Sequence, residues 1–222
     1  MFRIGLIIGL TFLVYGQSLG NAFVRWDDSM LIYENPIVRE ISWKSLKAAF
    51  TTYDPELYIP LTFLSYQIDY AIGGMHPFMF HLTNLVLHTL NAVLVFFLVT
   101  LLGIPSPLGG GLGRGGQRNS STPSPCPLPW GEGNGGPHFV AFAVATIWAI
   151  HPLNTEAVAW ASARKDVLST FFFLLSIILY LRYRNEKRET RNEKLTTLFY
   201  WSSVGVFLLG LLSKVMVLTL PV

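Results

Sequence analysis

The sequence predicts an all-α integral membrane protein, a bundle of about five membrane-spanning helices. Only 13% of the 222 residues are charged and 51% are hydrophobic, whereas soluble domains carry about 25% charged residues. The mean hydropathy is +0.45. Several apolar runs approach the ~20 residues that a helix needs to cross the hydrocarbon core. The topology of these runs therefore has to be worked out before any site is considered.

Five apolar runs are expected to span the membrane, at residues 4–19, 78–102, 139–150, 167–183 and 198–220. The first run, with Arg3 before it, also fits a signal peptide, but it is longer than most signal-peptide cores and further spans follow. We therefore favour a retained span. The chain stops while it is still apolar, and we expect it to be a truncated product of a longer protein.

The third run is too short to span the membrane alone. About 12 residues of helix reach ~18 Å, against a hydrocarbon core of ~30 Å. Either the helix continues through residues 151–156, or that polar segment dips into the membrane. Irregular backbone at that depth is tolerated only where it lines a cavity or is buried in protein.

Basic residues after the fourth run give the orientation of the bundle. Cytoplasmic loops of membrane proteins are enriched in Lys and Arg, and this loop contains Arg182, Arg184, Lys187, Arg188, Arg191 and Lys194. The N-terminus is then cytoplasmic, and residues 21–77 and 151–166 both lie outside. Residues 105–137 are rich in Gly and Pro and are expected to form a flexible cytoplasmic loop, an insertion into the membrane domain.

The large external loop, residues 21–77, is expected to contain two short surface helices. Ser42 is a suitable N-cap for a helix from Trp43 to Phe50. A second helix can begin at Pro60, because proline is tolerated in the first turn. It can end at Gly73-Gly74, because glycine readily adopts the left-handed conformation.

Two adjacent carboxylates, Asp27 and Asp28, follow the first apolar run directly. Ionisable groups at the mouth of a membrane bundle are candidates for function. The alternative is a solvated acidic turn that caps a helix. The residues themselves do not decide between these two interpretations.

A polar stripe crosses the second span. His81, Asn84, His88 and Asn91 are three, four and three residues apart, which places them on one face of a helix. Polar groups are costly against lipid, so this face should point into the bundle or a water-filled cavity. It can serve as interhelical hydrogen-bond glue or bind a ligand directly.

Other functional classes are disfavoured. The single cysteine excludes an intramolecular disulfide framework and a cysteine-rich metal site. The net charge of +3 does not indicate a nucleic-acid partner, because the positive charge is concentrated in one loop beside a span.

Several segments together resemble a known family. They are FVRWDDSMLIYENPIV, YIPLTFLSYQIDYAIGG, HPFMFHLTNLVLHTLNAVL, IWAIHPLNTEAVAWASARKDVLSTFFFLLS and LLSKVMVLTLP. Their order and spacing are similar to the membrane half of the transmembrane and tetratricopeptide-repeat protein O-mannosyltransferases and their bacterial relatives, in the glycosyltransferase C superfamily. The resemblance covers nearly the whole chain apart from the Gly/Pro-rich loop.

The resemblance implies a membrane glycosyltransferase. The donor would be a sugar, mannose in this family, on polyprenyl or dolichyl phosphate, and the acceptor a protein Ser or Thr hydroxyl. The paired acids would be Asp27 and Asp28, and the second external motif would include His151, Glu156 and the basic pair Arg164 and Lys165. Other partners would be membrane lipids. We favour the bacterial inner membrane over the endoplasmic reticulum.

The chemistry of the implied inverting transfer suggests roles for these residues. A carboxylate within reach of the acceptor hydroxyl can remove its proton, and two adjacent acids tend to raise one pKa, which suits a base. Arg164 and Lys165 could bind the departing phosphate, or could simply anchor a span at the interface.

His151 and Glu156 could complete a divalent-cation site with Asp27 and Asp28. They could equally form a helix-capping turn. For the chain as a whole, the alternative to an enzyme is a non-catalytic membrane module, either transporter-like or a scaffold fragment.

Overall fold

The computed structural model describes residues 1–52, 57–103, 137–189, 193–215 and 217. The elements of this part are helical, with no β-strand among them. The longer helices are α1 (Phe2–Tyr15), α2 (Trp43–Thr51), α3 (Pro60–Gly73), α4 (Pro77–Leu102), α5 (Pro137–Ile150), α7 (Arg164–Glu189) and α8 (Glu193–Ser213). Shorter turns are η1 (Gly16–Gly20), η2 (Ser29–Tyr33), η3 (Pro152–Asn154), α6 (Thr155–Ala159) and η4 (Ala161–Ala163).

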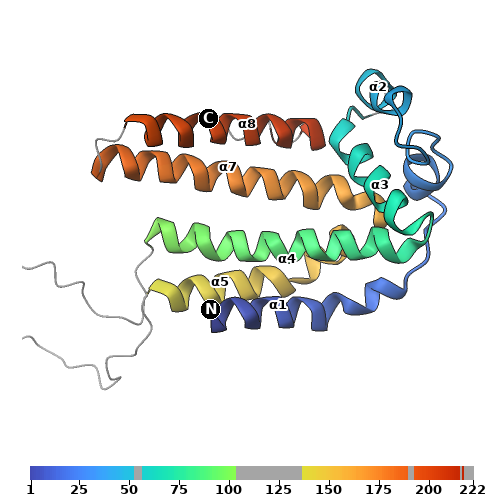
Figure 1. Cartoon of the computed structure of the whole chain (residues 1–222). Coiled ribbons are helices and arrows are strands. Elements are labelled where there is room, and N and C mark those ends of the chain that lie inside the picture. Colours follow the sequence, from blue (N-terminus) through green and yellow to red (C-terminus); the bar gives the residue numbers. More distant parts are fainter. Residues whose placement is uncertain (53–56, 104–136, 190–192, 216, 218–222) are drawn as a thin grey trace, which may run out of the picture.

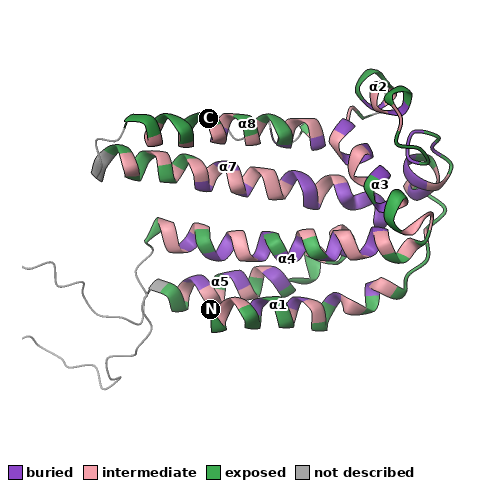
Figure 2. Ribbon diagram, viewed as in Figure 1, coloured by how far each residue is buried: buried purple, intermediate pink, exposed green. Residues whose placement is uncertain are grey.

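The long helices form a bundle, and the first loop covers one end of it. Helices α1, α4, α5, α7 and α8 run side by side, while α2 and α3 lie across the end where α4 begins (Figure 1). Helix α4 is central, since it contacts α1, α5 and α7, and α8 packs on α7. Buried residues are concentrated on the facing sides of α4, α5 and α7 (Figure 2).

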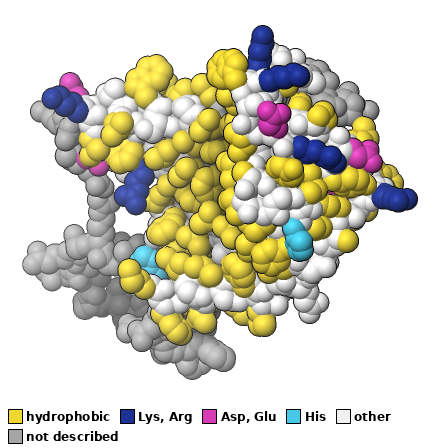
Figure 3. All heavy atoms as spheres, turned by 45° about the vertical axis from the view of Figure 1, so that its right-hand side comes forward, with side chains coloured by type: hydrophobic (Ala, Val, Ile, Leu, Met, Phe, Trp, Pro, Cys, Tyr) yellow, Lys and Arg dark blue, Asp and Glu magenta, His cyan; other side chains and the backbone are white. Residues whose placement is uncertain are grey.

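Four helical stretches are long and apolar enough to cross a membrane: Phe2–Gly20, Pro77–Leu102, Ala161–Lys187 and Glu193–Ser213. Hydrophobic side chains cover much of the visible surface between the two ends of the bundle (Figure 3). The prediction of an all-α membrane bundle is confirmed. The expected third span forms α5, a shorter apolar helix. The Gly/Pro-rich loop 105–137 lies outside the described residues except for its last position.

The chain breaks after α5, which excludes one of the two alternatives for the short third run, a helix that continues through residues 151–156. Helix α5 ends at Ile150, so a continuous helix through residues 151–156 is not formed. Its 14 residues reach ~21 Å, whereas the 26 residues of α4 reach ~39 Å. Beyond the end of α5, α6 and η4 contact α4. Together with η3 they form what we call the broken segment, residues 151–163.

Both helices predicted in the first loop are present. The Ser42 hydroxyl accepts from the Ser45 amide at 3.2 Å, and the Ser45 hydroxyl accepts from the Ser42 amide at 3.0 Å, which together form a capping box before α2. Helix α3 begins at Pro60 and is followed by Gly74, whose φ of 62° favours glycine. The Thr62 hydroxyl donates to the Ser213 carbonyl at 3.1 Å and so connects α3 to the end of α8.

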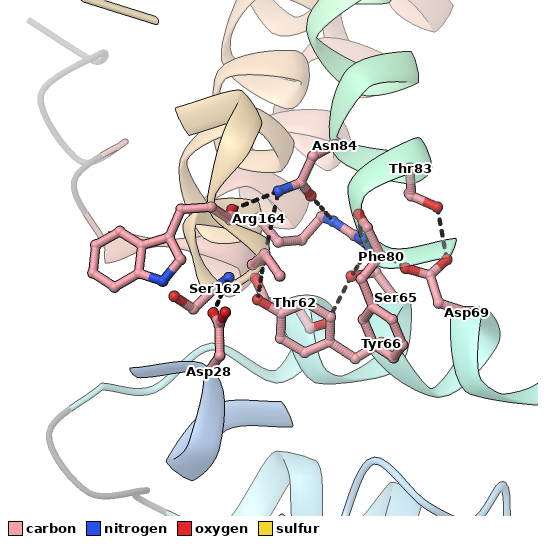
Figure 4. Close-up of polar contacts among 12 residues, drawn as sticks. Asp28, Thr62, Ser65, Tyr66, Asp69, Phe80, Thr83, Asn84, Ser162 and Arg164 are labelled. Atoms are coloured by element: carbon pink, nitrogen blue, oxygen red, sulfur yellow. Dashed lines mark hydrogen bonds and ion pairs between the residues drawn. The ribbon is translucent and has the colours of Figure 1, made fainter. Parts of the chain in front are cut away.

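A buried arginine joins α3, α4 and α7. Arg164 is fully buried, and its Nη2 lies 2.7 Å from Asp69 Oδ2 and 2.7 Å from the Phe80 carbonyl (Figure 4). Its Nε donates to Asn84 Oδ1 and its Nη1 to the Ser65 hydroxyl. A buried charge of this kind is tolerated only when it is paired and its donors are satisfied.

The surroundings of this arginine reinforce the pairing. Thr83 donates to the second oxygen of Asp69 at 2.7 Å, and the ring of Tyr66 lies 5.2 Å from the guanidinium carbon. Burial raises the pKa of the Tyr66 phenol well above its usual range, although Arg164 opposes this effect. Tyr66 is therefore a neutral hydrogen-bond donor, and its hydroxyl lies 3.2 Å from the Ala161 carbonyl.

We predict that removing one partner of the Arg164–Asp69 pair destabilises the bundle. Arg164→Met and Asp69→Asn should each cost about 3–5 kcal/mol, because the remaining charge is left unpaired in the interior. For a chain of this length that corresponds to a fall in Tm of roughly 6–20 °C, measurable by thermal unfolding in detergent.

The double variant Arg164→Met/Asp69→Leu removes both charges and should recover part of the loss. Lys44→Gln, which changes an exposed lysine of α2, serves as the control and should leave Tm unchanged. Single variants that unfold at the temperature of the unaltered protein would contradict the assignment.

Candidate active site at the mouth of the bundle

The two adjacent acids occupy different environments. Asp28 is fully buried, and its carboxylate accepts two backbone hydrogen bonds, from the Val24 amide at 2.9 Å and the Ser162 amide at 2.8 Å. Figure 4 shows Asp28 pointing from the first loop toward Ser162. Each of its oxygens has a fixed donor, so Asp28 holds the loop against the broken segment.

Asp27 faces the surface instead. Its side chain is 37% exposed, and its Oδ2 lies 3.6 Å from the Nζ of Lys165, whose side chain is 14% exposed. This separation is longer than a charge-assisted hydrogen bond, so the pair is loose even though Lys165 is mostly buried. An incoming substrate can therefore separate Asp27 from Lys165 at little cost.

The partners of the two acids lie one helical turn apart. Ser162, bonded to Asp28, and Lys165, paired with Asp27, are three residues apart at the junction of η4 and α7. Residues three apart on a helix lie on the same face. The buried bond of Asp28 thus sets the position from which Lys165 reaches Asp27.

The residue after Lys165 in α7 forms a second ion pair. Asp166 pairs with Lys214, which follows the last residue of α8. Sequence reasoning did not select Lys214 as a site residue, although a lysine directly after an apolar run is a usable signal. The mouth therefore carries two lysines, Lys165 and Lys214, each held by a carboxylate.

Arg164 does not lie at this mouth. The sequence predicts that Arg164, like Lys165, binds the donor phosphate. In the structure its guanidinium is buried among Asp69, Asn84 and Ser65, as described above, with no exposed surface. This requires a correction, since Arg164 organises the interior and Lys165 is the member of the pair that reaches the surface. The partners Asp69 and Ser65 were missed because they lie in α3, about 100 residues earlier.

His151 forms the capping turn that the sequence left open. Its Nδ1 accepts from the Leu153 amide at 3.2 Å, and its carbonyl accepts from the Tyr15 hydroxyl at 2.8 Å. Glu156 lies in the first turn of α6 and is exposed. In the described part of the chain, no hydrogen bond or ion pair joins either residue to Asp27 or Asp28.

The divalent-cation site considered for these four residues is not assembled. Within residues 1–52, 57–103, 137–189 and 193–215, no group of three or more His, Cys, Asp or Glu side chains lies close enough to hold a metal ion.

The polar stripe of α4 points into the bundle, as predicted, and three of its members bind backbone carbonyls. Asn84 Nδ2 donates to the Trp160 carbonyl at 2.8 Å, and Asn91 Nδ2 donates to the Val167 carbonyl at 2.9 Å. The ring Nε2 of His88 lies 2.8 Å from the Ala149 carbonyl. Of these carbonyls, that of Ala149 lies just before the broken segment, that of Trp160 within it and that of Val167 just after it. Both ring nitrogens of His81, which is also buried, have no hydrogen-bond partner among the described residues.

Comparison with known proteins identifies relatives along most of the chain. It is 30% identical over 186 residues to a mouse protein named "Protein O-mannosyl-transferase TMTC1", which covers 80% of this chain and 16% of that protein. It is 30% identical over 217 residues to a human "Protein O-mannosyl-transferase TMTC4", covering 91% of this chain and 26% of that protein.

A fruit-fly "Protein O-mannosyl-transferase Tmtc3" is 29% identical over 142 residues, which cover 64% of this chain and 14% of that protein. No family model matches the chain, and no solved structure matches it significantly. The chain thus spans about a quarter or less of the length of these curated relatives. Together with the helical membrane bundle, these relatives show that the chain belongs to the TMTC protein O-mannosyl-transferase family.

Proposed function

We propose that this chain forms the catalytic mouth of a membrane glycosyltransferase. It transfers mannose from a polyprenyl- or dolichyl-phosphate donor to a Ser or Thr hydroxyl of a protein, with Asp27 as the base. One observation carries the proposal: Asp27 is partly exposed and loosely paired with a lysine, whereas the neighbouring Asp28 is buried and each of its oxygens accepts a backbone hydrogen bond. The names of the relatives support the sugar and the type of acceptor.

Asp27 is suited to act as a general base. An aliphatic hydroxyl is a poor nucleophile near neutral pH, and a carboxylate within hydrogen-bond reach can take its proton as the attack develops. Asp28 cannot do so in this arrangement, because it is fully buried and both of its oxygens are held by backbone amides. Asp28 is a positioning residue that holds Asp27 and Lys165 in register.

Lys165 is suited to receive the leaving phosphate. During the transfer, the bond between the sugar C1 and the phosphate oxygen breaks while a bond from C1 to the acceptor oxygen forms. The hydroxyl proton passes to Asp27, and the electron pair of the broken bond stays on the lipid phosphate. Attack opposite the phosphate inverts the configuration at C1. A lysine ammonium stabilises the charge that develops on the phosphate.

Donor binding would also affect the base, because Lys165 is paired with Asp27. In the protein without donor, the ammonium of Lys165 forms an ion pair with the Asp27 carboxylate. When a donor phosphate draws Lys165 away, Asp27 loses its ion-pair partner and becomes available to the acceptor hydroxyl. Donor binding would in this way prepare the base for the acceptor.

The membrane orientation proposed for this activity places Asp27 outside. The basic residues at the other end of α7, including Arg182, Arg184 and Lys187, face the cytoplasm by the positive-inside rule. The N-terminus is then also cytoplasmic. Transfer would take place on the periplasmic side in a bacterium or on the lumenal side of the endoplasmic reticulum.

We predict that Asp27→Asn abolishes transfer without disturbing the fold. The rate should fall by about 10²–10⁴, the usual contribution of a general base, while Tm stays close to that of the unaltered protein and donor binding is not weakened, because Lys165 no longer has to leave Asp27. The measurement is transfer of labelled mannose from polyprenyl-phosphate mannose to a Ser/Thr-containing peptide, in membranes that lack other O-mannosyltransferase activity.

Two further variants separate catalysis from positioning. Asp28→Asn should lower Tm as well as transfer, because its amide NH₂ would face one of the two backbone donors. Glu34→Gln alters another exposed acid of the same loop and should have no effect. Absence of transfer by the unaltered chain, or full activity of Asp27→Asn, would refute the proposal.

Replacement of Lys165 should weaken binding of the lipid-phosphate donor and leave binding of the peptide acceptor unchanged. We expect Lys165→Gln to raise KM for the lipid-phosphate donor about tenfold, the effect of losing roughly one charge-assisted contact, with KM for the peptide unchanged. Lys165→Arg should restore part of the affinity, and Lys47→Gln, an exposed lysine of α2, serves as the control. A rise in peptide KM with an unchanged donor KM would show that the role assigned to Lys165 is wrong.

A further inference from the structure

A cavity lies at the end of the bundle opposite Asp27. It is a broad cavity, open to the surface, with a volume of about 640 Å³, and it is formed by the ends of α7 and α8 that are nearest to each other in the chain (Figure 1). Its lining includes Tyr183, Lys187, Glu193, Thr197, Tyr200 and Trp201. None of these residues takes part in the site described above.

The cavity lies at the depth of lipid headgroups. Lys165 at the mouth and Lys187 in the cavity are 22 residues apart on the continuous helix α7, which corresponds to ~33 Å. The hydrocarbon core of a bilayer is ~30 Å thick. If one lysine lies at one membrane surface, the other therefore lies at the opposite surface.

Aromatic rings surround the cavity in the way expected at such a surface. The ring of Tyr200 lies 5.4 Å from that of Tyr183 and 5.5 Å from that of Trp201. Trp201 is 64% exposed. Tyr and Trp are enriched at membrane interfaces because their rings have both apolar and polar parts. A cluster of this kind fits an opening that faces lipid headgroups.

The charges in the cavity match a zwitterion. Among the described residues that line it, Lys187 is the one cation and Glu193 the one carboxylate. Lys187 is held by Tyr183, with its Nζ 3.4 Å from the hydroxyl and 5.7 Å from the ring centroid. A phosphate can bind Lys187 and the hydroxyl of Thr197, while a primary ammonium can donate to Glu193 and pack on the tyrosine faces.

The two charges distinguish among headgroups. A purely anionic headgroup would leave Glu193 close to a second negative charge. A choline headgroup carries a quaternary ammonium that has no N–H to donate to the carboxylate. We propose that this cavity binds the phosphoethanolamine headgroup of a bilayer phospholipid. The proposal is independent of the glycosyltransferase activity.

The test is lipid binding by the whole chain, measured by native mass spectrometry from detergent. Phosphatidylethanolamine, phosphatidylcholine and phosphatidylglycerol with identical acyl chains are titrated separately. We expect phosphatidylethanolamine to bind at least fivefold more tightly than the other two. Lys187→Gln should weaken it about tenfold, and Glu193→Gln should remove the preference over phosphatidylglycerol.

Matched controls lie on the same helices. Glu186→Gln and Lys194→Gln change neighbouring charges that do not line the cavity and should leave binding unchanged. Lys187→Arg keeps the cation and should retain most of the affinity. Circular dichroism of each variant excludes a folding defect as the cause of weaker binding.

Free phosphoethanolamine distinguishes a lipid site from a site for a soluble ligand. Competition at millimolar concentration, together with tight binding of the lipid, supports the headgroup site. Binding of free phosphoethanolamine without binding of the lipid would overturn the proposal in favour of a soluble ligand. Equal binding of all three lipids, unaffected by Lys187→Gln and Glu193→Gln, would show that the rings are an ordinary aromatic belt.

Discussion

The broken segment, residues 151–163, interrupts the regular helices of the bundle, and polar groups of the neighbouring elements hydrogen-bond its irregular backbone. Backbone N–H and C=O groups that leave a regular helix and become buried need hydrogen-bond partners from elsewhere in the chain. Tyr15 of α1, Tyr66 of α3 and Asn84 of α4 each bind a carbonyl of this segment. Asp28, in the first loop, accepts a hydrogen bond from the Ser162 amide of this segment. Four parts of the chain are thereby fixed around one interruption.

This interruption explains why two adjacent acids differ so much. Helix α5 stops early, and η4 leads into α7 at the mouth. The Ser162 amide is therefore available to Asp28, and Lys165 is available to Asp27. Arg164 then begins α7 inside the protein, anchored to Asp69 and Asn84. The side chains of residues 164 and 165 therefore point to different places, one into the interior and the other to the surface. Of two adjacent basic residues, Arg164 is thus fully buried, whereas Lys165 is partly exposed beside Asp27.

Much of the fold could be predicted from the sequence because membrane spans and short capped helices are local signals. Ser42, Pro60 and Gly74 marked the helix ends of the first loop correctly, and the spacing of Asn84, His88 and Asn91 predicted a buried face. The partners of these residues depend on long-range packing. The pairing of Arg164 with Asp69, of Asp166 with Lys214 and of Asp28 with Ser162 joins residues 95, 48 and 134 positions apart. No periodicity or motif in one sequence records such contacts, which is why Arg164 was assigned to the wrong environment.

A structure of the protein with a lipid-phosphate mannose donor bound would test the division of labour at the mouth most directly. The account predicts that Asp28 keeps its hydrogen bonds to the Val24 and Ser162 amides, while Lys165 leaves Asp27 and contacts the phosphate. The Arg164–Asp69 pair should remain closed. A donor phosphate held by Arg164, or an Asp28 carboxylate turned out of its buried site toward the sugar, would contradict it.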